Sequence, residues 1–171
     1  PGSYVTALVG SLEKHSYDPS RDIAHYRDED FQTHLREALS TAPDDDIVYL
    51  LQIMEEMPQA DWSAEYRQLL SRDSIAVKSA ALGYLGRHGS QEDLESILAH
   101  QTHPDDSVRA KAVAATAVVG KHTVVEDIQA ALEDPSPAVR GAAVAGLINA
   151  GDLDGLLAAG AVLRDLLASD D

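Results

Sequence analysis

The chain has 171 residues, no cysteine, and 29 acidic against 13 basic residues, which gives a formal net charge of −16. Without cysteine, disulfides, thiolate zinc sites and cysteine nucleophiles are excluded. An acidic field repels phosphate backbones and anionic lipid, so we expect neither nucleic acid nor a membrane as a partner. No apolar stretch approaches the roughly 20 residues that span a bilayer, and we expect the protein to work in the cytoplasm.

The N-terminal region predicts a cap and not a site. Residues 1–3 resemble the remnant of a cleaved expression tag, and residues 4–30 favour an N-terminal capping segment of a single domain over 4–171. The segment holds four metal-ligating side chains that would share one face of a continuous helix: Asp18, Asp22, His25 and Glu29. Because Pro19 argues against that continuity, a solvated capping face is the preferred interpretation, and we expect no metal and no cofactor.

From about residue 28 onwards the chain repeats itself with a period of 31 residues. A valine followed by a base recurs at residues 77–78, 108–109 and 139–140, and a glycine recurs at Gly89, Gly120 and Gly151. Two independent markers in one register predict repeats over about 28–58, 59–89, 90–120 and 121–151, with a C-terminal cap over 152–171.

Each repeat has the pattern of two helices. The first helix carries large apolar residues at helical spacing, and the second carries mainly alanine and valine. In the last repeat, Pro135 ends the first helix, Ser136 is expected to cap the second, and Pro137 suits its first turn. The closing glycines are expected to adopt the left-handed conformation that follows many helix ends.

A single helical hairpin cannot bury both of its faces, so neighbouring repeats must stack. The predicted fold is all-α, a right-handed α-solenoid of about four to five stacked hairpins. Residues 152–171 add one more helix of the first type, with five leucines at helical spacing: Leu156, Leu157, Leu163, Leu166 and Leu167.

The repeated pattern of an acid, a Val-Arg or Val-Lys pair, alanines and a closing glycine, as in DSIAVKSAALGYLGRHG, resembles HEAT repeats of the short, phycobilin-lyase type. The resemblance covers roughly residues 28–151. It implies that Lys78, Arg109 and Arg140 form a structural ladder in which each base bonds an acidic residue of a neighbouring loop. A ligand-binding stripe is the alternative for these three bases.

The resemblance also implies that the second helices line a concave side, where the exposed positions would meet a partner. These positions are Gln52, Glu56, Ser79, Gly83, Arg87, Ala114, Val118, Ala145 and Asn149, with Ala110 and Gly141 in the same rows. Their small size admits two interpretations that stay open: a close approach by a partner, or tight packing inside the protein. The turns between helices predict an acidic edge made of Asp44, Asp45, Asp46, Asp73, Asp105, Asp106 and Asp134.

No pattern for catalysis stands out, since the chain has no Gly-x-Ser-x-Gly elbow and no strand-linked glycine loop for phosphate. We therefore expect a non-enzymatic module that binds a protein or peptide with a basic patch on its concave helices and acidic edge. Its sharper form is an inhibitor or immunity-type antidote. The alternative is a bilin lyase-like or chaperone-like protein that acts on a tetrapyrrole-carrying partner, as the resemblance implies.

Overall fold

The computed structural model describes residues 29–55, 61–150 and 153–168, and these residues form helices and the turns between them, with no strand. The predicted all-α class is confirmed. The chain forms two compact units that divide between Asp61 and Trp62. The right-handed sense, the 31-residue period and the boundaries of the repeats and caps stay predictions.

The first unit contains a helical pair, α2 (Glu29–Thr41) and α3 (Asp44–Glu55). Three aspartates fill the first turn of α3, where a carboxylate interacts favourably with the helix dipole. The apolar side chains that recur along both helices are buried: Leu35, Leu39, Ile47, Leu50, Leu51 and Met54. Each helix of this pair therefore has a buried apolar side.

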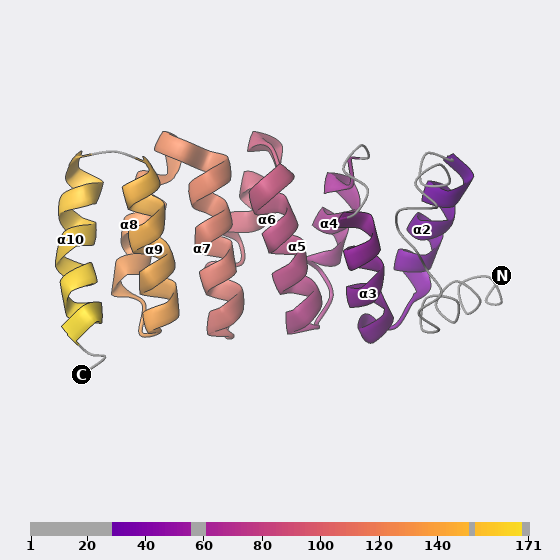
Figure 1. Ribbon diagram of the computed structural model, residues 1–171, viewed down its shortest axis with the longest axis horizontal. Coiled ribbons are helices and arrows are strands. Elements are labelled where there is room, and N and C mark those ends of the chain that lie inside the picture. The colour runs from indigo at the N-terminus through magenta and orange to yellow at the C-terminus, as the bar shows by residue number, and fades with distance from the viewer. Residues whose placement is uncertain (1–28, 56–60, 151–152, 169–171) are drawn as a thin grey trace. The chain divides into compact units, whose positions relative to one another are not determined.

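The second unit alternates short helices with long ones (Figure 1). Its short first helices are α4 (Ser63–Leu69), α6 (Leu94–Leu98) and α8 (Val125–Ala130). Its long second helices are α5 (Ile75–His88), α7 (Asp106–Gly120) and α9 (Pro137–Ala150), and α10 (Leu153–Ala168) follows them. Single turns of 3-10 helix connect them at η2 (Gln91–Asp93), η3 (Lys121–Val124) and η4 (Ala131–Glu133).

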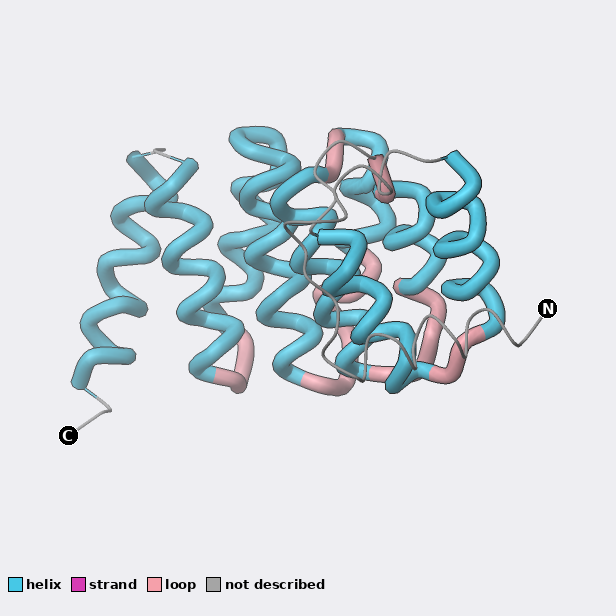
Figure 2. The backbone as a smooth tube through the Cα atoms, turned by 45° about the vertical axis from the view of Figure 1, so that its right-hand side comes forward, coloured by secondary structure: helices cyan, strands magenta, loops and turns pink. Residues whose placement is uncertain are grey.

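The long helices stack in chain order, α5 on α7, α7 on α9 and α9 on α10, as Figures 1 and 2 both show. Small residues set these contacts. An ideal Cβ on Gly86 would lie 3.1 Å from the Cα of Ala115, and one on Gly146 would lie 2.8 Å from the Cβ of Ala117. This packing of consecutive helices is that of an α-solenoid.

Large side chains from the short helices fill the space behind the long ones. Trp62, Tyr66, Ile97 and Ile128 are fully buried. Tyr66 stacks on Tyr84 of α5 with a ring-centroid distance of 3.8 Å. Each hairpin therefore joins a helix that supplies bulk to one whose small residues allow close stacking.

The predicted left-handed glycines are wrong at both positions that the structure describes. Gly89 has φ −68° and ψ 166°, which is extended backbone, and Gly120 has φ −82° inside the last turn of α7. The positive φ belongs to Lys121, with φ 52° and ψ −127°. Gly151 lies outside the described residues.

Space, and not handedness, explains why glycine fits at residues 89 and 120. An ideal Cβ on Gly89 would lie 2.4 Å from the carbonyl oxygen of Leu85, and one on Gly120 would lie 2.4 Å from Cγ1 of Val124. A repeated glycine therefore marks a close approach of the chain to itself at the end of each second helix.

Side chains fix the starts of the second helices. Ser74 accepts from the backbone N–H of Val77, and Asp105 accepts from the N–H groups of residues 107 and 108. Pro137 is the first residue of α9, as expected for proline at a helix start. Ser136 differs from the expected cap because its hydroxyl donates to Asp106 at 2.7 Å.

The last helix, α10, has 16 residues, whereas α4, α6 and α8 have five to seven. Ala159 is buried, whereas four of the predicted leucines are exposed by 39 to 68%: Leu156, Leu157, Leu163 and Leu167. Nothing is described for the side chain of Leu166. Within the described ranges, no helix is long and apolar enough to cross a membrane.

Candidate partner-binding surface

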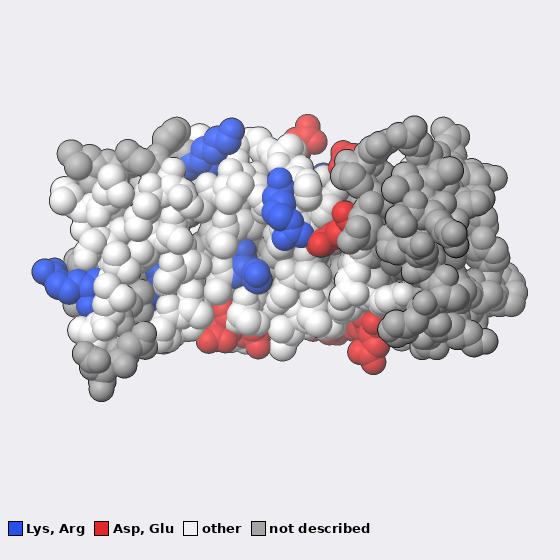
Figure 3. Space-filling view, in the orientation of Figure 1, with Lys and Arg blue, Asp and Glu red and all other residues white. Residues whose placement is uncertain are grey.

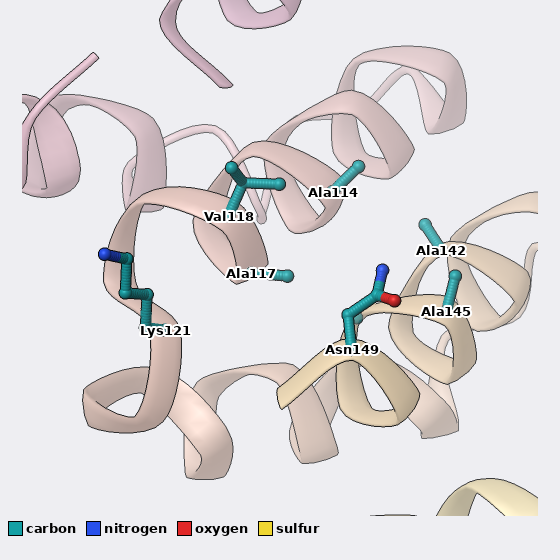
Figure 4. Close-up of a pocket in the computed structure, with 8 residues that line it drawn as sticks. Ala114, Ala117, Val118, Lys121, Ala142, Ala145 and Asn149 are labelled. Carbon is teal, nitrogen blue, oxygen red and sulfur yellow. The ribbon is translucent and has the colours of Figure 1, made fainter. Parts of the chain in front are cut away.

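A groove of about 530 Å³ lies between the C-terminal halves of α7 and α9 (Figure 4). Its lining consists of Ala114, Ala117, Val118, Lys121, Ala142, Ala145, Gly146 and Asn149. Most of these side chains end at Cβ, so methyl groups and backbone form much of the groove floor. Val118 is 57% exposed, which is unusual for a valine in the middle of a packed unit.

The positions predicted to meet a partner on these two helices line that groove. Ala114, Val118, Ala145 and Asn149 all belong to it, and all four are exposed. Figure 4 shows the Asn149 side chain directed into the space between the helices. Gly141 is also open, since an ideal Cβ there would meet nothing within 4 Å.

The other predicted positions form no part of the groove. On α5, Ser79 and Gly83 are half-buried and Arg87 is exposed, with Nη1 3.5 Å from an ideal Cβ on Gly83. Gln52 is exposed on α3 in the first unit, and Glu56 lies outside the described residues.

The two open interpretations of the small residues apply to different sides of the same helices. Ala112 and Ala143 are fully buried between stacked helices, and Ala115 is nearly so. Ala114 and Ala145 lie on the other side and are exposed. Each alanine-rich helix therefore uses small residues twice, once for packing and once for an accessible surface.

Charge is segregated between the two sets of helices in the second unit. Helices α5, α7 and α9 together contain one acidic residue, Asp106, which is the first residue of α7. Exposed bases lie on them or at their ends: Arg87, Lys111 and Lys121. Figure 3 shows basic side chains over this face, with most of the visible acidic ones toward the helix ends. The near absence of acidic residues from these helices can be read from the sequence, but the net charge of −16 gives no indication of it.

The three ladder bases make the same bond in successive repeats. Lys78 donates to the carbonyl of Arg72, Arg109 to that of His103 and Arg140 to that of Asp134. In each case the acceptor lies six residues before the base. The bonds hold the loop that precedes each second helix against that helix.

Arg109 also bridges two repeats. Its Nε donates to Oδ2 of Asp134 at 2.8 Å and its Nη2 to Oδ1 at 2.9 Å, so the pair is bidentate. Both side chains are 13% exposed. The hydrogen bond from Arg109 lowers the pKa of Asp134, and the same bond raises the pKa of Arg109. The bond to a neighbouring acid expected of every base is thus found at Arg109, whereas the bonds shown for Lys78 and Arg140 go to carbonyls.

The acidic edge of the second unit is only partly available to a partner. Asp73 and Asp106 are exposed, whereas Asp134 is held by Arg109 and Asp105 caps α7. The pKa of Asp105 is lowered, mainly because the side chain of Ser107 donates a hydrogen bond to its carboxylate. In the first unit, Asp45 is exposed and Asp44 and Asp46 are half-buried.

The part of the chain that the structure describes contains no group of three or more side chains placed to hold a metal ion. Asp18, Asp22 and His25 of the weighed metal cluster lie outside that part. His100 contacts two carbonyl oxygens, those of Ser96 at 3.0 Å and Leu70 at 3.2 Å, and so connects α6 to the end of α4.

Residues 94–171, which include α7, α9 and the groove between them, match the family model of HEAT repeats. This part of the chain is therefore HEAT-like. HEAT repeats generally act as scaffolds for protein interaction, and the family is typically non-enzymatic. A comparison with curated proteins found no match.

Proposed function

We propose that this HEAT-like protein binds a protein or peptide on the exposed side of α7 and α9, and that α5 extends the surface. The observation that carries the proposal is the groove of about 530 Å³, whose lining is small, partly apolar and open to solvent. Such a lining lets another backbone approach closely, as in the groove modes of peptide recognition.

The composition of the surface also favours binding energetically. Alanine and glycine have no side-chain rotamers to lose, so an occupant would order few groups on this side of the interface. Val118 offers exposed apolar area, and the Asn149 amide can donate to and accept from a partner's backbone. Burial of Val118 would thus supply affinity, while Asn149 would fix the position of the bound segment.

A blocking substitution tests the proposal. Ala145→Trp places a large ring in the groove, and Ala130→Trp places the same ring on an exposed position of α8, away from the groove. Partners captured from native lysate and identified by mass spectrometry are then measured as purified proteins by calorimetry. We expect Ala145→Trp to weaken binding at least about 10-fold and Ala130→Trp to leave it unchanged. Equal affinity of the two variants for every captured partner contradicts the proposal.

We also propose that the partner carries a basic patch that faces the acidic edge. The exposed carboxylates of Asp73 and Asp106 support this in the second unit. Rim charges act mainly on the association rate, and an inhibitor or antidote that blocks a basic cleft would use them in this way. Asp73→Asn should slow association about two-fold at low salt, whereas Asp127→Asn on α8 should not. Association rates that change neither with Asp73→Asn nor with salt would contradict a basic patch on the partner.

A further inference from the structure

The groove carries a charge opposite to that of the chain as a whole. From this we infer that it binds an acidic segment of the partner protein, with carboxylates that pair with Lys121 and Lys111. The inference rests on the proposed function and specifies the chemistry of the bound segment. It separates two parts of the partner: a basic patch at the acidic edge, and an acidic segment on the helix face.

The first support is the state of the two lysines. Lys121 forms one end of the groove (Figure 4), and Lys111 lies three residues before Ala114, on the same face of α7. Both are exposed, and no ion pair or hydrogen bond to another described residue involves either side chain. By contrast, Arg109 is paired with Asp134 and Arg67 with Asp93 at 2.8 Å.

The second support is the absence of repulsion. Among the described residues of α5, α7 and α9, no carboxylate follows Asp106, which lies at the opposite end of α7 from Lys121. An entering carboxylate would therefore meet two cations and no carboxylate from these three helices, whereas an entering lysine would meet like charge. The groove thus discriminates between the two signs, although the chain has more than twice as many acids as bases.

The dipoles of α7 and α9 limit where the carboxylates can sit. Both helices end beside the groove, and a helix C-terminus carries partial negative charge. We therefore place the carboxylates at the lysine ammonium groups on the solvent side and the apolar part of the segment on the alanine floor. The best-fitting segment has small or aliphatic residues on one side and glutamate or aspartate beside them.

Two designed peptides test the inference on the full chain. Both are alanine-rich helices of about 16 residues; one carries glutamates along one side, and the other carries lysines at the same positions. Binding is measured by fluorescence anisotropy at about 0.03 M and about 0.3 M salt. We expect the acidic peptide to bind at low salt and to lose most of its affinity at high salt.

Charge reversal at the two lysines gives the decisive comparison. The double variant Lys111→Glu, Lys121→Glu should bind the acidic peptide at least about 10-fold more weakly and the basic peptide more tightly. Arg164→Glu, an exposed reversal on α10 outside the groove lining, shifts the net charge in the same direction by half as much. It should change the affinity for neither peptide by more than about two-fold.

The backbone at Lys121 allows a variant in which stability and binding change in opposite directions. At φ 52° and ψ −127° a lysine is strained and a glycine is not. Lys121→Gly should therefore raise the melting temperature of the protein and lower its affinity for the acidic peptide a few-fold. A purely structural lysine would give the first result without the second, and that outcome overturns its role in binding.

The outcomes separate this inference from the proposed function. If the basic peptide binds better and Ala145→Trp abolishes that binding, the groove is a binding site but the inferred charge is wrong. If neither peptide binds at low salt, the inference is wrong, and the proposed function then depends on the captured partners alone. Acidic-peptide binding that Ala145→Trp leaves intact also overturns the inference, because the lysines then act outside the groove.

Discussion

The two sides of α7 and α9 have nearly the same composition and opposite surroundings. On one side, Ala112, Ala143 and Gly146 are buried against neighbouring helices. On the other side, Ala114 and Ala145 face solvent beside the groove. The difference shows that a small residue has no single meaning in a helical repeat, because its position around the helix decides whether it permits packing or access.

The charged residues divide in the same way. Arg109 is bound to the carboxylate of Asp134 and to two loop carbonyls, and it is largely covered. Lys111, two residues later on the same helix, is exposed and makes no bond to another described residue. One base belongs to the fold, and the other is available to a partner.

Leucine at two glycines of α9 gives the largest expected contrast. Gly146→Leu should lower the free energy of unfolding by about 3 kcal/mol, because even a Cβ would lie 2.8 Å from that of Ala117. Gly141→Leu should change it by no more than about 0.5 kcal/mol, because the space there is open. Urea unfolding measures both. Equal losses would mean that the two sides of α9 are not distinct.

The loss of unfolding free energy should also differ between Arg109 and Lys111, by somewhat less than between the two glycines. Arg109→Met leaves the mostly covered carboxylate of Asp134 without its partner and should cost about 2 kcal/mol of unfolding free energy. Lys111→Met serves as the matched control and should cost no more than about 0.5 kcal/mol. A Lys111 variant as unstable as the Arg109 variant would show that this lysine has a structural role.

The pH dependence of stability tests the Arg109 pair from the acidic partner. Because the folded pKa of Asp134 lies below its unfolded value of about 3.9, the pair stabilises the fold above that value. The contribution is lost as pH falls through the folded pKa. The stability difference between wild type and Asp134→Asn should therefore be constant near neutral pH and shrink below about pH 4. Asp105 acts in the same direction in both proteins, so the difference isolates Asp134. A gap that widens on acidification would contradict the assignment.

Alanine at the same two glycines gives the smallest expected effect, and the two changes should have opposite signs. Gly141→Ala should stabilise the protein by about 0.5 to 1 kcal/mol, because alanine restricts the unfolded chain and favours helix at an open site. Gly146→Ala should destabilise it, since the added methyl group needs the neighbouring helix to move. Thermal unfolding at one protein concentration measures both, and equal signs would contradict the contrast.

The repeat in the sequence was enough to predict the all-helical stack, because its large and small apolar residues recur at fixed positions. Val77, Val108 and Val139 are buried as their register requires. Local capping chemistry was partly predictable: Pro137 begins α9, but the hydroxyl of Ser136 bonds Asp106 from the preceding repeat. A bond across 30 residues leaves no local pattern in the sequence.

The sequence by itself determined which positions are small, which bases recur and where each helix can begin. Only the tertiary structure decided which small residues face solvent, because burial depends on the neighbouring helix and not on the helix itself. It also showed why glycine is needed at residues 89 and 120: a Cβ there would clash with nearby atoms, and neither glycine adopts the expected left-handed conformation. The pairing of Arg109, and the lack of it at Lys111 among the described residues, was decided in the same way, since only stacking brings the carboxylate of Asp134 within reach of Arg109.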